Sequence, residues 1–236
     1  MTSGTQPIAQ RESIGQREPT GEREPERPLR RDAERNRQKI VAAAREVFAR
    51  RGLTATLDDV AHAAGVGVGT VYRRFPDKEA LVEAALEDRL EEVVTVLEGA
   101  VAEKCAWEGL TLFLQRTAEM HAEDRGLREV ALRAGHGKDH LPAVRERIEP
   151  LVHQLVDRAH REGALRPDAG ADDIPLLLHM VGAVADSAHT VRPDLHRRYL
   201  GLLIEGLRNR PDRAELVPGL TSDELAAVSR SWKPSA

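Results

Sequence analysis

The chain has 236 residues, of which 41% are hydrophobic and 3% aromatic, and its formal net charge is −4 at pH 7. This length allows one large or two modest domains, and the single cysteine, Cys105, excludes an internal disulfide framework and is typical of a reducing cytosol. The N-terminus lacks the apolar core of a signal peptide, and the most apolar later stretch, residues 174–185, is too short to cross a bilayer. We therefore expect a soluble, cytoplasmic protein without a membrane partner.

Residues 1–30 are rich in Arg, Glu, Pro, Gln and Gly and contain almost no large apolar side chain. Such a composition cannot bury enough apolar surface to fold, so a disordered tail is expected. A solvated tail is favoured over an arm that touches DNA. Arg30 and Arg31 nevertheless directly precede the first expected helix, and basic arms of this kind can enter the minor groove.

The next stretch, residues 31–78, predicts three helices. The first covers residues 32–51, with apolar side chains at i, i+4, i+7 and i+8 counted from Ile40. The second begins after Thr56, because Thr56 and Asp59 have the spacing of a capping box. Gly65 ends this second helix, since glycine reaches a positive φ without a Cβ clash.

The third helix is placed by angle, at about 100° per residue from Val68. Its expected apolar half contains Val68, Val71, Tyr72 and Phe75, and its outward half contains Gly69, Thr70 and Arg73, with Arg74 at the edge. A small, polar and cationic face of this kind can reach base edges in the major groove. Asp77 is then expected to cap the next helix and to place Lys78 in its first turn, where an ammonium group and backbone N–H groups form an anion site. The arrangement is a helix-turn-helix.

These residues resemble the DNA-binding domain of the tetracycline-repressor (TetR) family of bacterial transcriptional regulators. The resemblance is carried by residues 64–66, 69–72 and 78–81 together with Phe75. It implies that Thr70 and Tyr72 contact DNA, and that Lys78 and Thr56 hold phosphates. Two positions depart from the family pattern, since Gly67 replaces a serine or similar cap and Arg74 replaces a histidine or tyrosine. The expected DNA-binding residues are Thr56, Gly67, Val68, Gly69, Thr70, Tyr72, Arg73, Arg74 and Lys78.

The charge is unevenly distributed along the chain. Residues 31–78 carry a net charge of +4, residues 1–30 carry none, and residues 79–236 carry −8. A positive module on a negative body would bind the phosphate backbone and orient its own approach to DNA.

The remainder of the chain is predicted to be helical, and no strand pattern competes. Helices are expected at about residues 78–104, 107–123, 127–134, 142–162, 171–188 and 194–208. The expected fold class is thus all-α. Its parts are a disordered N-terminal tail (1–30), a three-helix DNA-binding domain (31–78), a regulatory and dimerisation domain (79–210) and a mobile C-terminal tail (211–236) with one short helix capped by Ser222.

The helix at residues 171–188 is apolar almost all round, so it has no solvent face of its own. It is expected to pack on its own core with one side and on a second subunit with the other. The TetR resemblance implies that it forms a four-helix dimer interface with the final helix; an ordinary monomer core is the alternative. The expected interface residues are Leu177, Val181, Val184, Tyr199, Leu203 and Leu207.

The helices expected after residue 79 carry many apolar side chains and a few polar ones that could together line a ligand pocket. Two histidines fall within strongly apolar helical stretches, where a buried polar group needs a partner that a ligand could supply. The alternative for each histidine is a hydrogen bond inside the protein. The candidate ligand-binding residues are Phe113, Thr117, Met120, His121, Leu155, His179 and Met180. Their mainly aliphatic character suggests a neutral or anionic organic compound.

Catalytic and cofactor motifs are weak. The glycines at 65, 67 and 69 do not follow a strand and lack the spacing of a dinucleotide loop. His136, Asp139 and His140 have ligand types that could form part of a metal site, but no third distant ligand is marked, and a surface loop is favoured. No cofactor and no metal are expected. The alternatives are an enzyme acting on a small molecule and a DNA-binding regulator that has no ligand. The sequence favours a homodimeric, ligand-responsive repressor of transcription that binds a palindromic double-stranded DNA operator.

Overall fold

The computed structural model describes residues 26–133 and 142–231, together with Met1. Its contacts divide the chain into two compact units, Met1–Arg35 and Asn36–Ala236. The described part of the first unit is the beginning of helix α1 (Glu26–Arg51), where Asp32 and Arg35 form an exposed ion pair at 3.7 Å. The second unit contains the rest of α1 and all later elements.

The described residues are helical, as predicted, and include no strand beyond an isolated bridge between Leu165 and Arg208. None of their helices is both long enough and apolar enough to span a lipid bilayer. Helix α1 is followed by the 3-10 helix η1 (Gly52–Thr54), α2 (Leu57–Ala64), α3 (Val68–Arg74), α4 (Lys78–Ala102), α5 (Ala106–Glu123), α6 (Arg125–Arg133), α7 (Pro142–Arg161), α8 (Asp173–Ala188), α9 (Leu195–Leu207) and α10 (Ser222–Ser231).

The helix-turn-helix forms at the positions that the local signals predict. Thr56 and Asp59 make both hydrogen bonds of the capping box at the start of α2. Gly65 ends α2 in the left-handed region, at φ 61° and ψ 39°. Asp77 caps α4 by accepting a hydrogen bond from the backbone N–H of Ala80 at 2.8 Å. These short-range interactions fix where α3 begins and ends.

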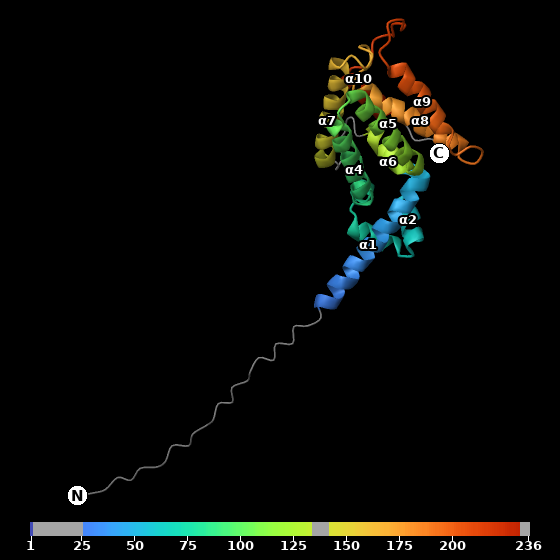
Figure 1. Cartoon of the computed structure of the whole chain (residues 1–236). Coiled ribbons are helices and arrows are strands. Elements are labelled where there is room, and N and C mark those ends of the chain that lie inside the picture. The colour runs from blue at the N-terminus through green and yellow to red at the C-terminus, as the bar shows by residue number, and fades with distance from the viewer. Residues whose placement is uncertain (2–25, 134–141, 232–236) are drawn as a thin grey trace. The chain divides into compact units, whose positions relative to one another are not determined.

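The body is built around α4 and α5. Helix α4 packs against α5 and α7, and α5 also contacts α8 and α9 (Figure 1). At Gly109 of α5, a Cβ would collide with the carbonyl oxygen of Ala100 of α4, so a glycine is required for this close approach. Since α4 runs from the helix-turn-helix into the body without a break, the contacts do not divide the chain at residue 78, where the sequence placed a domain boundary.

Helix α1 begins at Glu26 rather than at residue 32, so the predicted tail of residues 1–30 is too long at its C-terminal end. Pro28 misled the prediction, because proline is tolerated in the first turn of a helix, where backbone N–H groups have no intrahelical acceptor. The rest of that tail lies outside the described residues.

The C-terminal segment also differs from the prediction of a loose tail. Arg166 donates to the carbonyl oxygen of Ala214 at 2.7 Å, and Asp168 accepts from the backbone N–H of Leu216 at 3.1 Å. The short helix predicted near Ser222 is present as α10, but its capping residue is Thr221. It packs on α6, and its Leu225 is buried. Residues 211–231 are therefore joined to the body through polar contacts that no hydrophobic periodicity marks.

Candidate DNA-binding surface and ligand cavity

More of α3 is exposed to solvent than its sequence suggests. Val71 is fully buried and Phe75 nearly so, and these two residues anchor the short helix. Val68 and Tyr72, which the helical wheel placed on the apolar side, are instead 40% and 53% exposed. A seven-residue helix has room for little more than one anchoring residue per turn, so its flanks stay at the surface. Tyr72 thus joins the outward face.

The outward face of α3 combines open backbone with hydrogen-bonding groups. At Gly69 a Cβ would meet nothing within 4 Å, so no neighbouring group of the protein requires this glycine. Arg73 donates to the hydroxyl of Thr70 at 3.3 Å, which links the two side chains that were expected to face base edges. Arg73 and Arg74 are both exposed, and Gly67 caps the helix without a side-chain hydrogen bond.

Thr56 and Lys78, the two expected phosphate contacts, also have partners inside the protein. The Thr56 hydroxyl accepts from the backbone N–H of Asp59 at 3.1 Å and donates to its carboxylate at 2.8 Å. Hydrogen bonds from the backbone and side chain of Thr56, and then from Arg51, lower the pKa of Asp59 to about 2. The half-buried Lys78 donates its ammonium group to the carbonyl oxygen of Leu53 in η1.

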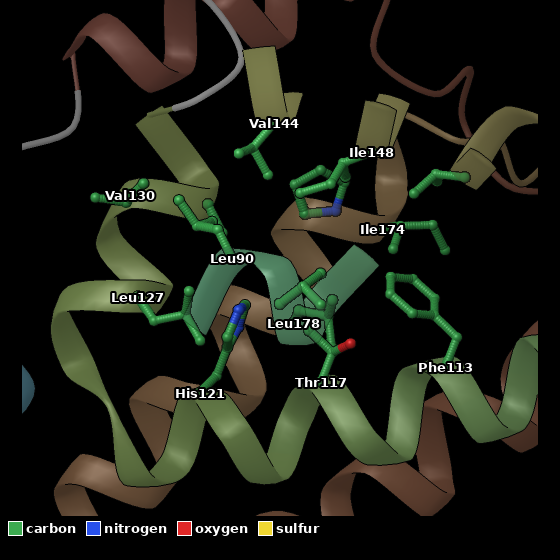
Figure 2. A pocket seen from close by; sticks show the side chains of 14 residues that line it. Leu90, Phe113, Thr117, His121, Leu127, Val130, Val144, Ile148, Ile174 and Leu178 are labelled. Carbon is green, nitrogen blue, oxygen red and sulfur yellow. The ribbon is translucent and has the colours of Figure 1, made fainter. Parts of the chain in front are cut away.

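A cavity lies in the body among α4, α5, α6, α7 and α8 (Figure 2). It has about 110 Å³ of space for the centres of water-sized molecules, and it is partly open to solvent. It is lined by Leu90, Val93, Phe113, Thr117, His121, Leu127, Val130, Ala131, Val144, Ile148, Val152, Ile174, Pro175 and Leu178.

Three of the seven predicted ligand residues, Phe113, Thr117 and His121, line this cavity. The other four do not. Leu155 belongs to the buried core, Met120 packs against that core, His179 is half-buried elsewhere on α8, and Met180 is 51% exposed on the outer side of α8. The aliphatic lining residues were missed because a cavity wall and a close-packed core have the same apolar sequence pattern.

His121 is the most unusual group of the cavity wall. It is 2% exposed, and neither ring nitrogen has a hydrogen-bond partner. Burial lowers its pKa to about 3, and the positive charge of Arg128 and the neighbouring His179 act in the same direction. One turn away on α5, the hydroxyl of Thr117 is likewise buried without a partner. Figure 2 shows both side chains rising from α5 into the cavity.

Helix α6 connects the cavity wall to η1. Its Leu127 lines the cavity, whereas Glu129 is 1% exposed beside η1. One oxygen of Glu129 accepts from the backbone N–H of Leu53 at 2.6 Å, and the other accepts from Arg125 at 2.9 Å. Gly52, at φ 62°, lies so close that a Cβ there would be 2.5 Å from Oε1 of Glu129. No sequence signal marked this buried carboxylate.

Helix α6 is also tied to α8. Arg128 is 3% exposed and donates to the carbonyl oxygens of His121 at 2.8 Å and Gly182 at 3.2 Å. Its guanidinium also forms an ion pair with Asp186 of α8. A side chain at Gly182 would collide with Arg128, so the glycine makes room for this arginine.

Helices α8 and α9 pack side by side (Figure 1). Some of their large apolar side chains are exposed. Two of the residues predicted for a dimer interface, Val181 and Leu207, are instead buried within the single chain. Leu177, Val184 and Leu203 are half-buried, and Tyr199 is 44% exposed. The sequence could not assign the α8 residues because that helix is apolar almost all round. The large exposed apolar side chains of the two helices are Met180, Tyr199 and Leu202.

The candidate metal ligands His136, Asp139 and His140 lie outside the described residues. Within the parts of the chain that the structure describes, no three His, Cys, Asp or Glu side chains are grouped to hold a metal ion.

Comparisons with known proteins match both parts of the chain. Residues 40–85 match the model for bacterial regulatory proteins of the tetR family, and residues 106–209 match that for the C-terminal domain of SbtR-like transcriptional regulators. The HTH-type transcriptional regulator SrpR of Pseudomonas putida is 26% identical over 192 residues, which cover 79% of this chain and 82% of SrpR.

Two solved structures are also similar. The TetR transcriptional regulator SCO0520 from Streptomyces coelicolor is 34% identical, and the match covers 73% of this chain and 98% of that one with a TM-score of 0.46. The regulator FadR from Bacillus subtilis, in complex with stearoyl-CoA, is 19% identical, with 72% and 99% of the two chains covered and a TM-score of 0.50. Together the two family models span more than half of the chain.

Proposed function

The chain belongs to the tetR family of bacterial regulatory proteins, and from that premise we propose that it is a homodimeric repressor that leaves a palindromic operator when a small organic compound occupies its cavity. It is a DNA-binding regulator of transcription, which removes the enzyme considered as the alternative. The proposal concerns which residues contact DNA, which surface pairs two copies, and how the cavity communicates with the operator.

On DNA, α3 would enter the major groove and read base edges. Thr70 and Arg73 are hydrogen-bonded to each other on its outward face, and Tyr72 projects beside them. An arginine at such a position favours guanine, whose O6 and N7 accept two hydrogen bonds. Arg74 adds an exposed charge for phosphate contact. Lys78 would bind a phosphate from the start of α4, where its ammonium group already meets the carbonyl oxygen of Leu53.

Two copies would pair through α8 and α9. Met180, Tyr199 and Leu202 are large apolar side chains that remain exposed in the single chain, and half-buried Leu177 and Leu203 adjoin them. A two-fold axis through this surface would present two copies of α3 to successive half-sites, about 34 Å apart on one face of the duplex. The operator would then have matching two-fold symmetry.

The observation that carries the proposed ligand response is the position of α6. The same helix lines the cavity with Leu127 and Val130 and holds η1 through Glu129 and the backbone N–H of Leu53. A molecule that displaces the cavity wall would therefore act on the element to which Lys78 is also bonded. A ligand shifts an equilibrium only by its different affinity for two forms of the protein. It must therefore favour the form of the dimer in which the two copies of α3 are wrongly spaced for the operator. The fold shared with FadR from Bacillus subtilis, which was solved with stearoyl-CoA, supports a lipophilic effector.

Selection of bound DNA from a random pool, at a defined salt concentration, tests the regulator and its operator together. Two-fold symmetric sites are expected. Operator affinity is then measured with and without compounds that raise the melting temperature of the protein. Selection of asymmetric single half-sites would contradict the dimer, and stabilising compounds that leave operator affinity unchanged would contradict the ligand response.

A further inference from the structure

Within the described parts of the chain, the cavity wall has two polar side chains, and both lack hydrogen-bond partners. Thr117 and His121 are each 2% exposed and lie one turn apart on α5. The hydroxyl of Thr117 and both ring nitrogens of His121 are buried without a partner. Buried polar groups in native proteins are nearly always hydrogen-bonded, because leaving one unpaired costs free energy. These groups therefore indicate a molecule that accepts the hydrogen bonds which the hydroxyl and the imidazole can donate.

The rest of the wall limits the charge of that molecule. Among the residues that the structure describes, fourteen line the cavity, and none of these carries a carboxylate, a guanidinium or an ammonium group. The nearby cation, Arg128, does not line the cavity, and its guanidinium is bonded to Asp186 and to the carbonyl oxygens of His121 and Gly182. A charged group would lose its hydration here without gaining an opposite charge, which is costly.

We propose that the effector is an uncharged lipophilic compound with a carbonyl group, which accepts hydrogen bonds from Thr117 and His121 while an aliphatic body fills the rest of the cavity. This assignment rests on the proposed ligand response and specifies its chemistry. A threonine hydroxyl and a neutral imidazole each offer one donor, and a carbonyl oxygen has two lone pairs to receive them. Burial keeps the imidazole neutral at physiological pH, so it donates without attracting an anion.

A matched series of eight-carbon compounds tests the charge of the effector. 2-Octanone, octanoate and octylamine have similar chains and differ in the polar end, which is neutral, anionic or cationic at pH 7.5. Isothermal titration of the full-length protein should detect 2-octanone, and both charged compounds should bind at least about tenfold more weakly because of the cost of burying their charge. Tighter binding of octanoate or octylamine, or no binding of any of the three, would overturn the assignment.

Variants on α5 test the polar contacts. Thr117→Val and His121→Phe should each weaken 2-octanone binding by about 2- to 12-fold, the range for one hydrogen bond. Without a ligand, Thr117→Val should be at least as stable as the wild type, since it removes an unpaired buried hydroxyl. Thr111→Val is the matched control, because the hydroxyl of Thr111 is also buried and unpaired but does not line the cavity. Equal 2-octanone affinity of all three variants and the wild type would refute the contacts.

Operator binding separates this assignment from the proposed function. If 2-octanone binds in the predicted manner but leaves operator affinity unchanged, the ligand response fails, and with it the role of the compound as an effector. If octanoate binds more tightly and releases the operator, the ligand response holds and the assigned chemical class is wrong.

Discussion

The buried carboxylate of Glu129 should stabilise the junction between α6 and η1, and Glu129→Gln measures its contribution. The two carboxylate oxygens accept from two donors, the N–H of Leu53 at 2.6 Å and Arg125 at 2.9 Å. Glutamine has a single acceptor oxygen, so one donor would face its NH₂ group. An unpaired buried group costs about 1–3 kcal/mol. Arg125 would keep an ion pair with Asp186, whose carboxylate lies 3.9 Å away, which reduces the loss there. We therefore expect the free energy of unfolding to fall by about 2–3 kcal/mol in total.

The matched control is Glu91→Gln, which makes the same change in an exposed ion pair. Glu91 accepts from Arg147 at 2.6 and 2.9 Å, and both side chains are nearly half exposed. Such pairs contribute about 0–1 kcal/mol. Chemical denaturation followed by circular dichroism, at equal protein concentrations, gives the free energy of unfolding of both variants. A Glu129→Gln variant as stable as Glu91→Gln would show that the junction is not held by this carboxylate.

The remaining predictions concern DNA, assembly and pH. Lys78→Ala should weaken binding to all DNA sequences alike and lower the magnitude of the slope of log affinity against log salt concentration by roughly 1. Arg73→Ala should instead cost about 1–3 kcal/mol of binding free energy and relax the preference at one base pair. Titrations of operator and scrambled DNA at several salt concentrations distinguish the two variants. Leu202→Glu should give monomers by light scattering, because an unpaired carboxylate in an apolar interface costs several kcal/mol, whereas Val217→Glu on the exposed C-terminal segment should remain dimeric. The pKa of His121 is about 3 in the folded chain and near 6.5 in the unfolded chain, so the unfolded chain binds more protons between these pH values. The free energy of unfolding should therefore fall as the pH drops through this window. Denaturation of His121→Phe at several pH values should show the loss of that part of the dependence.

The sequence predicted the helix-turn-helix well because the signals there are local. The capping box of Thr56 and Asp59 and the positive φ of Gly65 each depend on residues within one helical turn. The same reasoning failed for Val68 and Tyr72, because a helical wheel assumes that one whole side of a helix is covered. What covers a short helix is set by distant segments. In α3 only Val71 is buried, together with Phe75 directly after the helix.

The outward face of α8 illustrates a second limit. This helix is apolar almost all round, so periodicity does not distinguish Val181, which is buried in its own chain, from Met180, which is exposed. Likewise, Leu202 and Leu203 are neighbours of the same residue type, and the structure leaves the first more exposed. Which side of an apolar helix is buried depends on the size and position of the neighbouring elements. The sequence of the helix itself does not encode these.

The buried charges of α6 were beyond sequence reasoning for a different reason. Glu129 and Arg128 are adjacent charged residues in a helix that has a pronounced apolar side, a pattern that normally indicates a solvated face. They are buried because η1 and α8 supply partners from 54 to 76 residues away. Glycines reveal these contacts only in retrospect, since Gly52 and Gly182 are the positions where a Cβ would collide with the two side chains.

The energies at α6 are of the size that a ligand response needs. A tenfold loss of operator affinity requires a coupling free energy of about 1.4 kcal/mol between cavity and operator. A hydrogen bond to a charged group contributes about 1.5–3 kcal/mol, so the bond between Glu129 and the N–H of Leu53 would suffice if it formed in only one of two positions of α6. Because Lys78 is bonded to the other side of Leu53, through its carbonyl oxygen, displacement of η1 would also move the proposed phosphate contact at the start of α4. An effector that binds among apolar side chains could thus alter DNA binding through a single peptide segment, without any direct contact with the DNA-binding helices.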